Sequence, residues 1–204
     1  MLDLSDAIKG RRSVRKYLPL EVPHELIEDV LVSAGWAPSA HNSQPWRFIV
    51  LSDASVKQKL AIAMAEVWAA DLAKDGVAVK AEKRKERIER FANAPALILA
   101  CSTMEGLRKF SDEKRQKCER DLAMQSLGAA MQNLLLAAYG AGLGACWFCA
   151  PGFCKEAVRK VLKIPEAVEP QALVIIGYPA ETPSVPPKEL LAEYCFLDVW
   201  GGKF

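Results

Sequence analysis

The chain has 204 residues, of which 51% are hydrophobic and 25% are charged. A chain of this size buries about 70% of the surface that its unfolded form exposes, so it folds without a metal or a disulfide, and global disorder is excluded. The 27 basic and 25 acidic residues leave a net charge of +2, which argues against a general attraction to nucleic acids or membranes. We therefore expect one globular domain over residues 1–204, in which any basic site is local.

Two features of the sequence predict a cytoplasmic protein. It contains no run of about 18 apolar residues, and the N-terminus, MLDLSDAIKGRRS, lacks the apolar centre of a signal peptide. The six cysteines are then expected to be free thiols, because the cytosol keeps thiols reduced.

Apolar periodicity divides the chain into alternating helices and strands. In chain order, it predicts a helix over Leu4–Gly10, a helix over Pro23–Ala34, a strand over Arg47–Leu51, a helix over Asp53–Ala73, a charged helix over Val79–Arg90, a strand over Pro95–Cys101, a long helix over Asp112–Tyr139, a strand over Ala145–Phe148, a helix over Phe153–Leu162 and a strand over Ala172–Tyr178. Short apolar strands separated by helices indicate a sheet that is buried between helical layers. The charged helix is expected to lie over the surface.

The last segment, Pro179–Phe204, contains four prolines and ends in an apolar, aromatic stretch, YCFLDVW. The sequence offers no evident partner for this stretch within a compact monomer. We therefore expect it to wrap around a second subunit.

The motif RRSVRKY places Arg11, Arg12, Ser13 and Arg15 directly after the first predicted helix. Arginine offers planar pairs of donors to phosphate oxygens and a hydroxyl can complete the shell, so the motif predicts a phosphate clamp. The alternative needs no ligand: cations at the C-terminal end of a helix oppose the negative end of its dipole for about 0.3–1 kcal/mol each.

The loop WAPSAHNSQPW, residues 36–46, gathers polar side chains between two prolines and two indoles. Its hydrogen-bonding residues are Ser39, His41, Asn42, Ser43 and Gln44. Donors and acceptors beside flat apolar surface suit a planar heteroaromatic ligand. The alternative is an ordinary helix-to-strand connection that is rich in turn-forming residues.

The segment GAGLGACW, residues 140–147, superficially matches a dinucleotide-binding fingerprint through Gly140, Gly142 and Ala145. That fingerprint follows a strand and opens a helix, whereas here a helix ends and a strand begins, so we reject a Rossmann site. We expect the glycines to end the helix in left-handed conformations and to let main-chain N–H groups approach a ligand closely.

Cys146, Cys149 and Cys154 raise the alternatives of a metal site, an iron–sulfur cluster or a redox dithiol. Their spacing lacks a second pair of ligands, and His24 and His41 form no ligand motif with them, so we expect no metal. Free cysteines are also common as small buried hydrophobes. The sequence lacks G-x-S-x-G, GxxxxGK[ST] and HExxH, which disfavours hydrolases and ATPases and favours a cofactor as the source of the chemistry.

Taken together and in this order, RRSVRKY, APSAHNSQPW, GLGACW and IIGYP resemble the FMN-dependent nitroreductase family over nearly the whole chain. The resemblance implies an α+β fold with a central mixed sheet flanked by helices. It also implies a single FMN-binding domain over residues 1–204 and a domain-swapped homodimer with two FMN molecules at the subunit interface. The apolar C-terminal stretch fits such a dimer.

The resemblance also implies site residues, position by position. The FMN phosphate, the ribityl chain and one ring edge would be bound by Arg11, Arg12, Ser13 and Arg15. Along the isoalloxazine ring would lie, from the partner subunit, Pro38, Ser39, Ala40, His41 and Asn42, with Gln44 nearby. Past the ring would run Gly142, Leu143, Gly144, Phe148, Cys149 and Ala150, with the main-chain N–H of Cys149 directed at the reactive ring nitrogen. Lys188 stands about where the family often has a phosphate-binding arginine, although lysine cannot make the same bidentate contact.

The implied function is an oxidoreductase that passes electrons from NADH or NADPH, through FMN, to a nitroaromatic, quinone or other conjugated acceptor. The protein mainly positions and tunes the flavin. A narrower alternative comes from SAHNSQPWRF and FLDVW, which are similar to a nitroreductase-like domain that reduces a dehydro-intermediate in deazaflavin coenzyme biosynthesis. An alternative of another class is a flavin- or thiol-based redox sensor without turnover.

The family's substrate-discriminating residues lie in a variable segment, here about Val67–Phe91. This segment is a candidate lid over the flavin, and its basic residues would favour an anionic substrate. The alternative is a solvated helix face.

Overall fold

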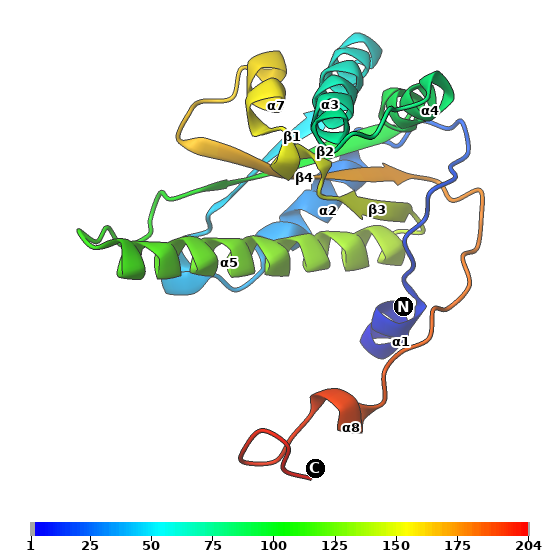
Figure 1. Ribbon diagram of the computed structural model, residues 1–204. Coiled ribbons are helices and arrows are strands. Elements are labelled where there is room, and N and C mark those ends of the chain that lie inside the picture. Colours follow the sequence, from blue (N-terminus) through cyan, green and yellow to red (C-terminus); the bar gives the residue numbers. More distant parts are fainter. Residues whose placement is uncertain (1–2, 204) are drawn as a thin grey trace.

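The core of the structure is a four-stranded sheet, shown in Figure 1 as part of the computed structural model, which describes residues 3–203. The strands are β1 (Trp46–Leu51), β2 (Ala96–Thr103), β3 (Gly144–Phe148) and β4 (Val168–Gly177), in the spatial order β1-β2-β4-β3. Each neighbouring pair is antiparallel. The expected α+β class is confirmed, whereas the expected mixed sheet is corrected to an antiparallel one in these strands. Parallel pairing occurs at a bridge between Ser13 and Ala145.

Helices cover both faces of the sheet. They are α1 (Leu4–Gly10), α2 (His24–Gly35), α3 (Ala54–Lys74), α4 (Ala81–Ala92), α5 (Glu113–Gly140), α6 (Ala150–Phe153), α7 (Lys155–Leu162) and α8 (Leu191–Tyr194), with a 3-10 turn η1 (Ala40–Asn42). Successive side chains of a strand point to opposite faces, and in β2 both sets are apolar and buried. Ile98 packs with α2 and α5, whereas its neighbour Leu99 packs with α3, α4 and α7. Figure 1 shows the two resulting layers, as the sequence predicted.

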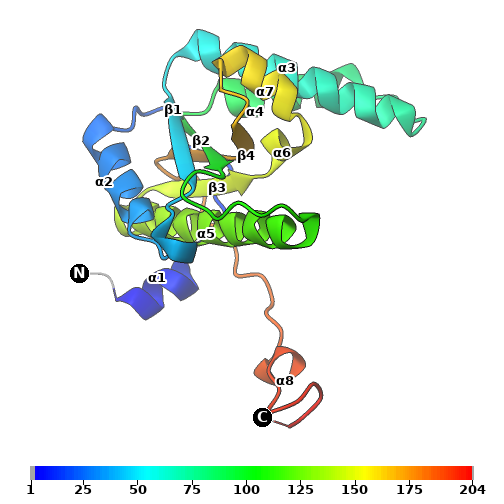
Figure 2. The same ribbon diagram turned by 90° about the vertical axis from the view of Figure 1, so that its left-hand side faces the viewer.

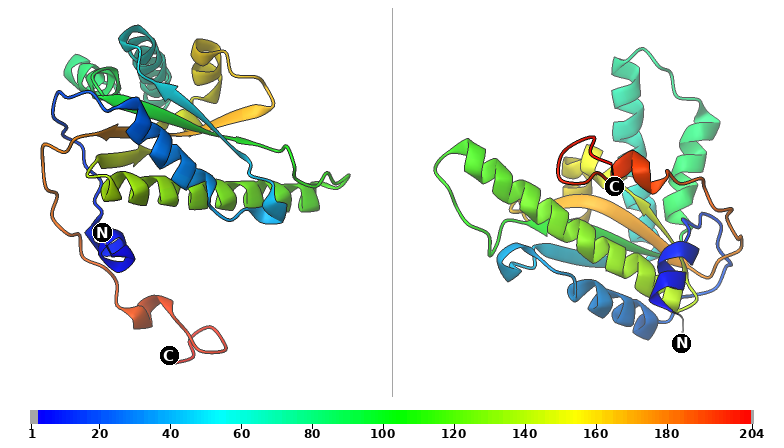
Figure 3. Two further views of the ribbon diagram at one scale, coloured as in Figure 1. Left: turned by 180° about the vertical axis from the view of Figure 1, so that it is seen from behind. Right: turned by 90° about the horizontal axis from the view of Figure 1, so that it is seen from below.

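Helix α5 is the longest element, and its sequence sets both of its ends. The Asp112 carboxylate accepts the N–H of Arg115 at 2.9 Å and caps the first turn. At the other end Gly142 has a φ of +76°, and the N–H of Leu143 donates to the Ala138 carbonyl at 2.8 Å. The 28 residues make a rod about 42 Å long, which crosses the sheet in Figure 3. Neither α5 nor any other helix described between residues 3 and 203 is long and apolar enough to cross a membrane.

Three predicted elements differ from the observed ones. The helix expected over Phe153–Leu162 is α7, which begins only at Lys155, because Cys154 has a non-helical φ of −138° and Phe153 ends the separate helix α6. The charged helix expected over Val79–Arg90 is α4, which extends far enough to bury Phe91 against the core. Strand β4 begins earlier than expected and so pairs along the full length of β2.

The C-terminal segment, residues 179–203, leaves the body of the protein as an extended arm. Figures 1 and 2 show it in orange and red, running past α1 to α8 and a final loop. Its start is fastened by the N–H of Ala180, which donates to the Lys16 carbonyl at 2.9 Å. Farther along, large apolar side chains are exposed, with 74% of Leu190 and 91% of Trp200 accessible. Exposed apolar surface of this kind marks a site of interaction.

Replacing Gly144 by alanine should destabilise the protein. A Cβ at this position would lie 2.9 Å from the Cβ of Val14, and Val14 is buried against the edge of the sheet. Overpacking of this kind costs about 1–3 kcal/mol, measurable by urea unfolding. Gly140→Ala is the control, because an added Cβ there meets open space at the end of α5. Equal unfolding free energies for the two variants would contradict the account.

Candidate functional site

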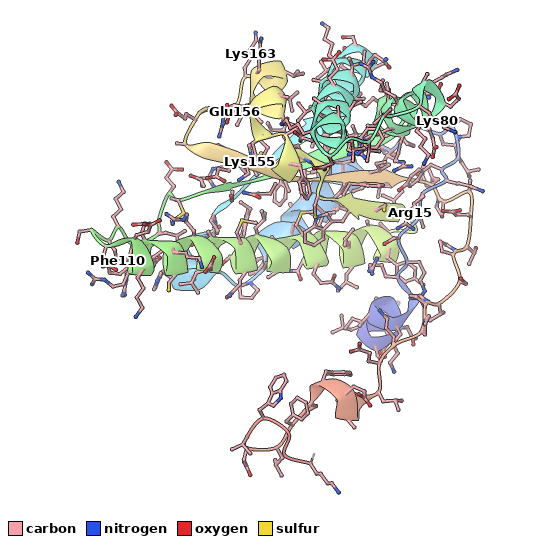
Figure 4. The ribbon with its side chains drawn as sticks, in the orientation of Figure 1. Arg15, Lys80, Phe110, Lys155, Glu156 and Lys163 are labelled. Carbon is pink, nitrogen blue, oxygen red and sulfur yellow. The ribbon has the colours of Figure 1, made fainter. Side chains whose placement is uncertain are left out.

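The segment Arg11–Tyr17 lies against the free edge of β3. The N–H of Val14 donates to the Ala145 carbonyl at 3.1 Å, and only 7% of Val14 is exposed. The Tyr17 hydroxyl donates to the Val14 carbonyl at 2.5 Å, and burial raises the pKa of Tyr17, so this donor stays protonated. These contacts hold the arginines of the motif at the end of the sheet, where Figure 4 shows Arg15.

Arg11 and Arg12 line a cavity of about 190 Å³ between this segment, the end of α5 and the start of the arm. Nη1 of Arg12 donates to the carbonyls of Lys9 and Arg11 at 2.6 and 2.7 Å, which holds the guanidinium in place. Its Nε is buried and has no hydrogen-bond partner in the described residues. A buried unpaired donor costs about 1–3 kcal/mol, and oxyanions make the strongest pairs with guanidinium groups. The geometry at Arg12 therefore fits a phosphate clamp.

Arg15 and Ser13 face the edge of β3. Nη1 of Arg15 donates to the Ser13 carbonyl at 3.2 Å. Glu181 holds the main chain here, because its Oε1 accepts the N–H groups of Arg15 and Lys16 at 2.7 and 3.1 Å. Burial raises the pKa of the Cys146 thiol on β3, and the charge of Arg15 and a hydrogen bond with Ser13 oppose that rise. The positive charge of Arg15 and the hydroxyl of Ser13 thus lie close to β3, next to which the ligand is expected.

Past the contact of Ala145 with Val14, no described residue makes a main-chain hydrogen bond to β3 on the side away from β4. The Ala145 carbonyl accepts the N–H of Val14, so the main-chain groups of Ala145 point away from β4. Because this direction alternates along an antiparallel strand, Trp147 points the same way, and the next residue in that set is Cys149. Cys149 is exposed. Its N–H therefore lies on the open edge, on the same side as the arginine segment.

The loop at residues 38–44 holds an unusual backbone conformation. His41, Asn42 and Gln44 have φ values of 55°, 52° and 46°, in the left-handed region that non-glycine residues rarely adopt. Such strain costs about 1–3 kcal/mol per residue, and it is typical of ligand clamps and active sites. The loop is held by Ser39, whose Oγ accepts the N–H of Gln44 at 3.0 Å, and by Ser126 of α5, whose Oγ accepts the N–H of Ala40 at 3.1 Å.

The structure brings together only part of the predicted site. Gly142, Leu143 and Gly144 line the same cavity as Arg11 and Arg12. The loop at residues 38–44 instead packs at Ser126, while the arginine cavity reaches Tyr139, about 20 Å farther along α5 at 1.5 Å per residue. Lys188 lies exposed on the arm, outside the residues that line the cavity, and Pro38 is exposed at the start of the loop. A single chain therefore leaves the two halves of the predicted site apart.

Several supporting residues were not found from the sequence. Glu181 contacts the arginine motif from a position more than 160 residues away, and no local signal marks it. Glu119 is buried in α5, and its Oε1 lies 3.6 Å from Nε2 of His41. A carboxylate on the apolar face of a helix is the one signal that singles out Glu119, because buried carboxylates need a partner.

A second cavity, of about 510 Å³, lies between α3, α4 and the connection from β3 to α6. Phe148 and Cys149 form one wall, and residues of the predicted lid segment, among them Trp68 and Arg87, form another. The cavity therefore opens next to the free edge of β3. Whether the segment moves as a lid stays a prediction.

The cysteines do not form a metal centre in the described residues, where no three His, Cys, Asp or Glu side chains gather. The six cysteines are free, and Cys146 and Cys154 are buried. Sγ of Cys154 donates to the Ala150 carbonyl at 3.2 Å. These two thiols therefore behave as small core residues.

Comparison with known proteins shows the same fold and family. The nitroreductase family model matches residues 8–178. A protein of Methanothermobacter thermautotrophicus with the provisional name NADH dehydrogenase/NAD(P)H nitroreductase is 34% identical over 186 residues, which cover 89% of this chain and 80% of that protein.

Two solved structures extend the comparison. The BluB-like flavoprotein of Clostridium difficile has a TM-score of 0.79 and 26% identity, covering 97% of this chain and 99% of its own. Iodotyrosine deiodinase bound to FMN and 3-iodo-L-tyrosine has a TM-score of 0.71 and 25% identity, covering 96% of this chain and all of its own. The family resemblance of the four motifs is thus confirmed, and the chain belongs to the nitroreductase family of flavoprotein oxidoreductases.

Proposed function

We propose that the protein is an FMN-dependent oxidoreductase that takes electrons from NADH or NADPH and passes them to a small conjugated acceptor, such as a nitroaromatic or a quinone. The observation that carries the proposal is Arg12, which lines a cavity beside β3 and whose buried Nε has no hydrogen-bond partner among residues 3–203. Two relatives support the proposal. Iodotyrosine deiodinase, which shares the fold, binds FMN, and the name of the relative from Methanothermobacter thermautotrophicus includes NAD(P)H nitroreductase. The narrower role in deazaflavin coenzyme biosynthesis stays a prediction from the sequence alone.

The residues of this chain would divide the work of holding the cofactor. Arg11, Arg12 and Ser13 would bind the phosphate, and Arg15 would donate to one edge of the ring, where its positive charge stabilises the reduced anionic form. The N–H of Cys149 would face the reactive ring nitrogen from the open edge of β3. When bound, FMN supplies the acceptance and donation of hydride that no side chain can provide.

We also propose that the site is completed in a homodimer. The loop at residues 38–44 lies about 20 Å from the arginine cavity along α5, so two α5 helices packed antiparallel would bring the loop of one subunit to the arginines of the other. Gly128 near the middle of α5 has open space around it, which allows close approach of a second helix. The exposed arm, with Leu190 and Trp200, would then be buried on the partner and bring Lys188 with it.

Arg12→Gln should weaken FMN binding by about 10- to 100-fold, because it removes a charge-assisted contact worth about 1.5–3 kcal/mol. The visible flavin absorption that stays with the protein after FMN addition and desalting measures binding, and bleaching by anaerobic NADH or NADPH measures reduction. Lys9→Gln is the matched control. It removes the same charge about one helical turn before Arg12, and the Lys9 side chain is exposed. Absence of flavin binding by the unmodified protein, or equal affinity in both variants, would refute the clamp.

Burial disfavours Cys154 as the reactive thiol of a redox sensor, whereas Cys149 is exposed, and the buried thiols make a separate prediction. Burial raises the pKa of Cys101 to about 12 and that of Cys154 to about 11. Because the thiolate is the reactive form, iodoacetamide at about pH 8 should label these two thiols far more slowly than the exposed Cys118. Peptide mapping of the labelled native protein gives the rates, and labelling of Cys101 as fast as Cys118 would show that the assignment is wrong.

The same pKa shifts predict how stability depends on pH. Unfolded thiols ionise near pH 9, while the two buried thiols stay protonated to about pH 11. Above pH 9 the unfolded state therefore binds fewer protons than the native state, and the free energy of unfolding falls as the pH rises. Replacing Cys101 by alanine should reduce this fall in urea unfolding, and an unchanged pH profile would speak against it.

A further inference from the structure

The cavity beside Cys149 has the size and lining of a small-molecule site. Its volume of about 510 Å³ lies within the usual range for such sites, roughly 300–1,000 Å³. The apolar part of its wall comes from Met64, Trp68, Leu72, Phe91, Phe148 and Phe153. Phe91 and Phe148 pack edge to face with their ring centroids 5.3 Å apart. Flat apolar walls of this kind accept a flat apolar body.

Arg87 gives this apolar cavity a cation that lacks an anion. Its guanidinium lies over the Trp68 ring, 4.6 Å from the centroid, and its Nε is buried without a hydrogen-bond partner in the described part of the chain. Among residues 3–203 no carboxylate lies within ion-pair distance of it, whereas the nearby Arg84 and Arg90 pair with Glu66 and Glu86 at 3.6 and 3.2 Å. Burial and the neighbouring Arg90 hold the pKa of Arg87 below its usual range. The group is therefore a half-buried cation that an oxyanion would stabilise.

The acidic residues of the cavity do not compensate this charge. Asp71 accepts a hydrogen bond from Nζ of Lys74 at 2.7 Å, and Asp75 lies exposed at the end of α3. Both carboxylates raise the pKa of Lys74, Asp71 chiefly through its hydrogen bond and Asp75 through its charge. Asp71 also acts on the Cys154 thiol of the cavity wall, whereas the charges that act on Arg87 are those of Arg90 and Cys154.

We infer that this cavity binds an acceptor with a flat apolar body and one carboxylate, with Arg87 as the specificity-determining residue that pairs with the carboxylate. Trp68 fixes the guanidinium from one face, which leaves its planar edge for two parallel hydrogen bonds. The apolar body would extend toward Phe148 and Cys149, next to the edge of β3 at which the flavin is proposed. The assignment of this ligand as the electron acceptor rests on the proposed function.

The test is equilibrium binding of para-nitrobenzoate and para-nitrobenzamide to the full-length protein by calorimetry, with and without FMN. The two compounds have the same shape and differ in charge. We expect the unmodified protein to bind the benzoate at least about tenfold more tightly, as one charge-assisted pair implies. Arg87→Gln should abolish this preference, and Arg87→Lys, which keeps the charge but loses the planar donor pair, should retain part of it.

Arg84→Gln is the matched control, because it removes the same charge from the same helix outside the cavity, and it should keep the preference. Equal binding of the two compounds, binding of neither, or a preference that survives in Arg87→Gln would overturn the inference. Binding of neither is also the result expected if the arm of a second copy fills the cavity. The measurement needs no NAD(P)H, so failure of the proposed flavin chemistry would appear separately, as absence of FMN retention or bleaching.

Discussion

The pairing of Val14 with Ala145 is the interaction on which the candidate site depends. It joins an N-terminal segment without regular structure to the edge of a strand more than 130 residues away. The pairing is possible because Gly144 has no side chain where Val14 must lie. The Tyr17 hydroxyl also holds the segment in place, because it donates to the Val14 carbonyl. Three arginines flank that anchor, and further contacts of Arg12 with the Lys9 carbonyl and of Arg15 with Glu181 hold them there.

Strand β3 lies between two candidate binding regions. On the outer side of β3, the arginine segment and the open main chain at Cys149 fit a phosphate-bearing planar cofactor. On the side of α3 and α4, an apolar cavity with one unpaired guanidinium fits a small ligand. Cys149 belongs to both regions, so β3 would connect the proposed cofactor site to the proposed ligand cavity. The loop at residues 38–44 is the third part of the predicted site. The left-handed φ values of His41, Asn42 and Gln44 indicate that its surroundings also fix its conformation.

Local signals made much of this predictable. The caps at Asp112 and Gly142 and the apolar run of β2 are written in neighbouring residues, so α5 and the sheet follow from the sequence. The proposed phosphate clamp rests on the donor chemistry of Arg11 and Arg12. Strand direction did not follow, because the hydrophobic pattern of a strand buried on both faces is the same in parallel and antiparallel sheets.

Long-range contacts could not be predicted, because a sequence pattern reports only on neighbouring residues. Glu181 binds the main chain of Arg15, and Arg87 stacks on Trp68, only because the fold brings distant segments together. The unpaired state of Arg87 is invisible in a helix sequence full of acidic neighbours. Only the structure shows that Glu86 is used by Arg90.

Hydrogen–deuterium exchange of the full-length protein with and without FMN tests the central claim most directly. If the docked arginine segment and the free edge of β3 hold the flavin, FMN should slow exchange in residues 11–16, 39–44 and 147–149 together and leave α7 unchanged. Protection that misses the arginine segment and the edge of β3, or appears only at α3 and α4, would contradict the account.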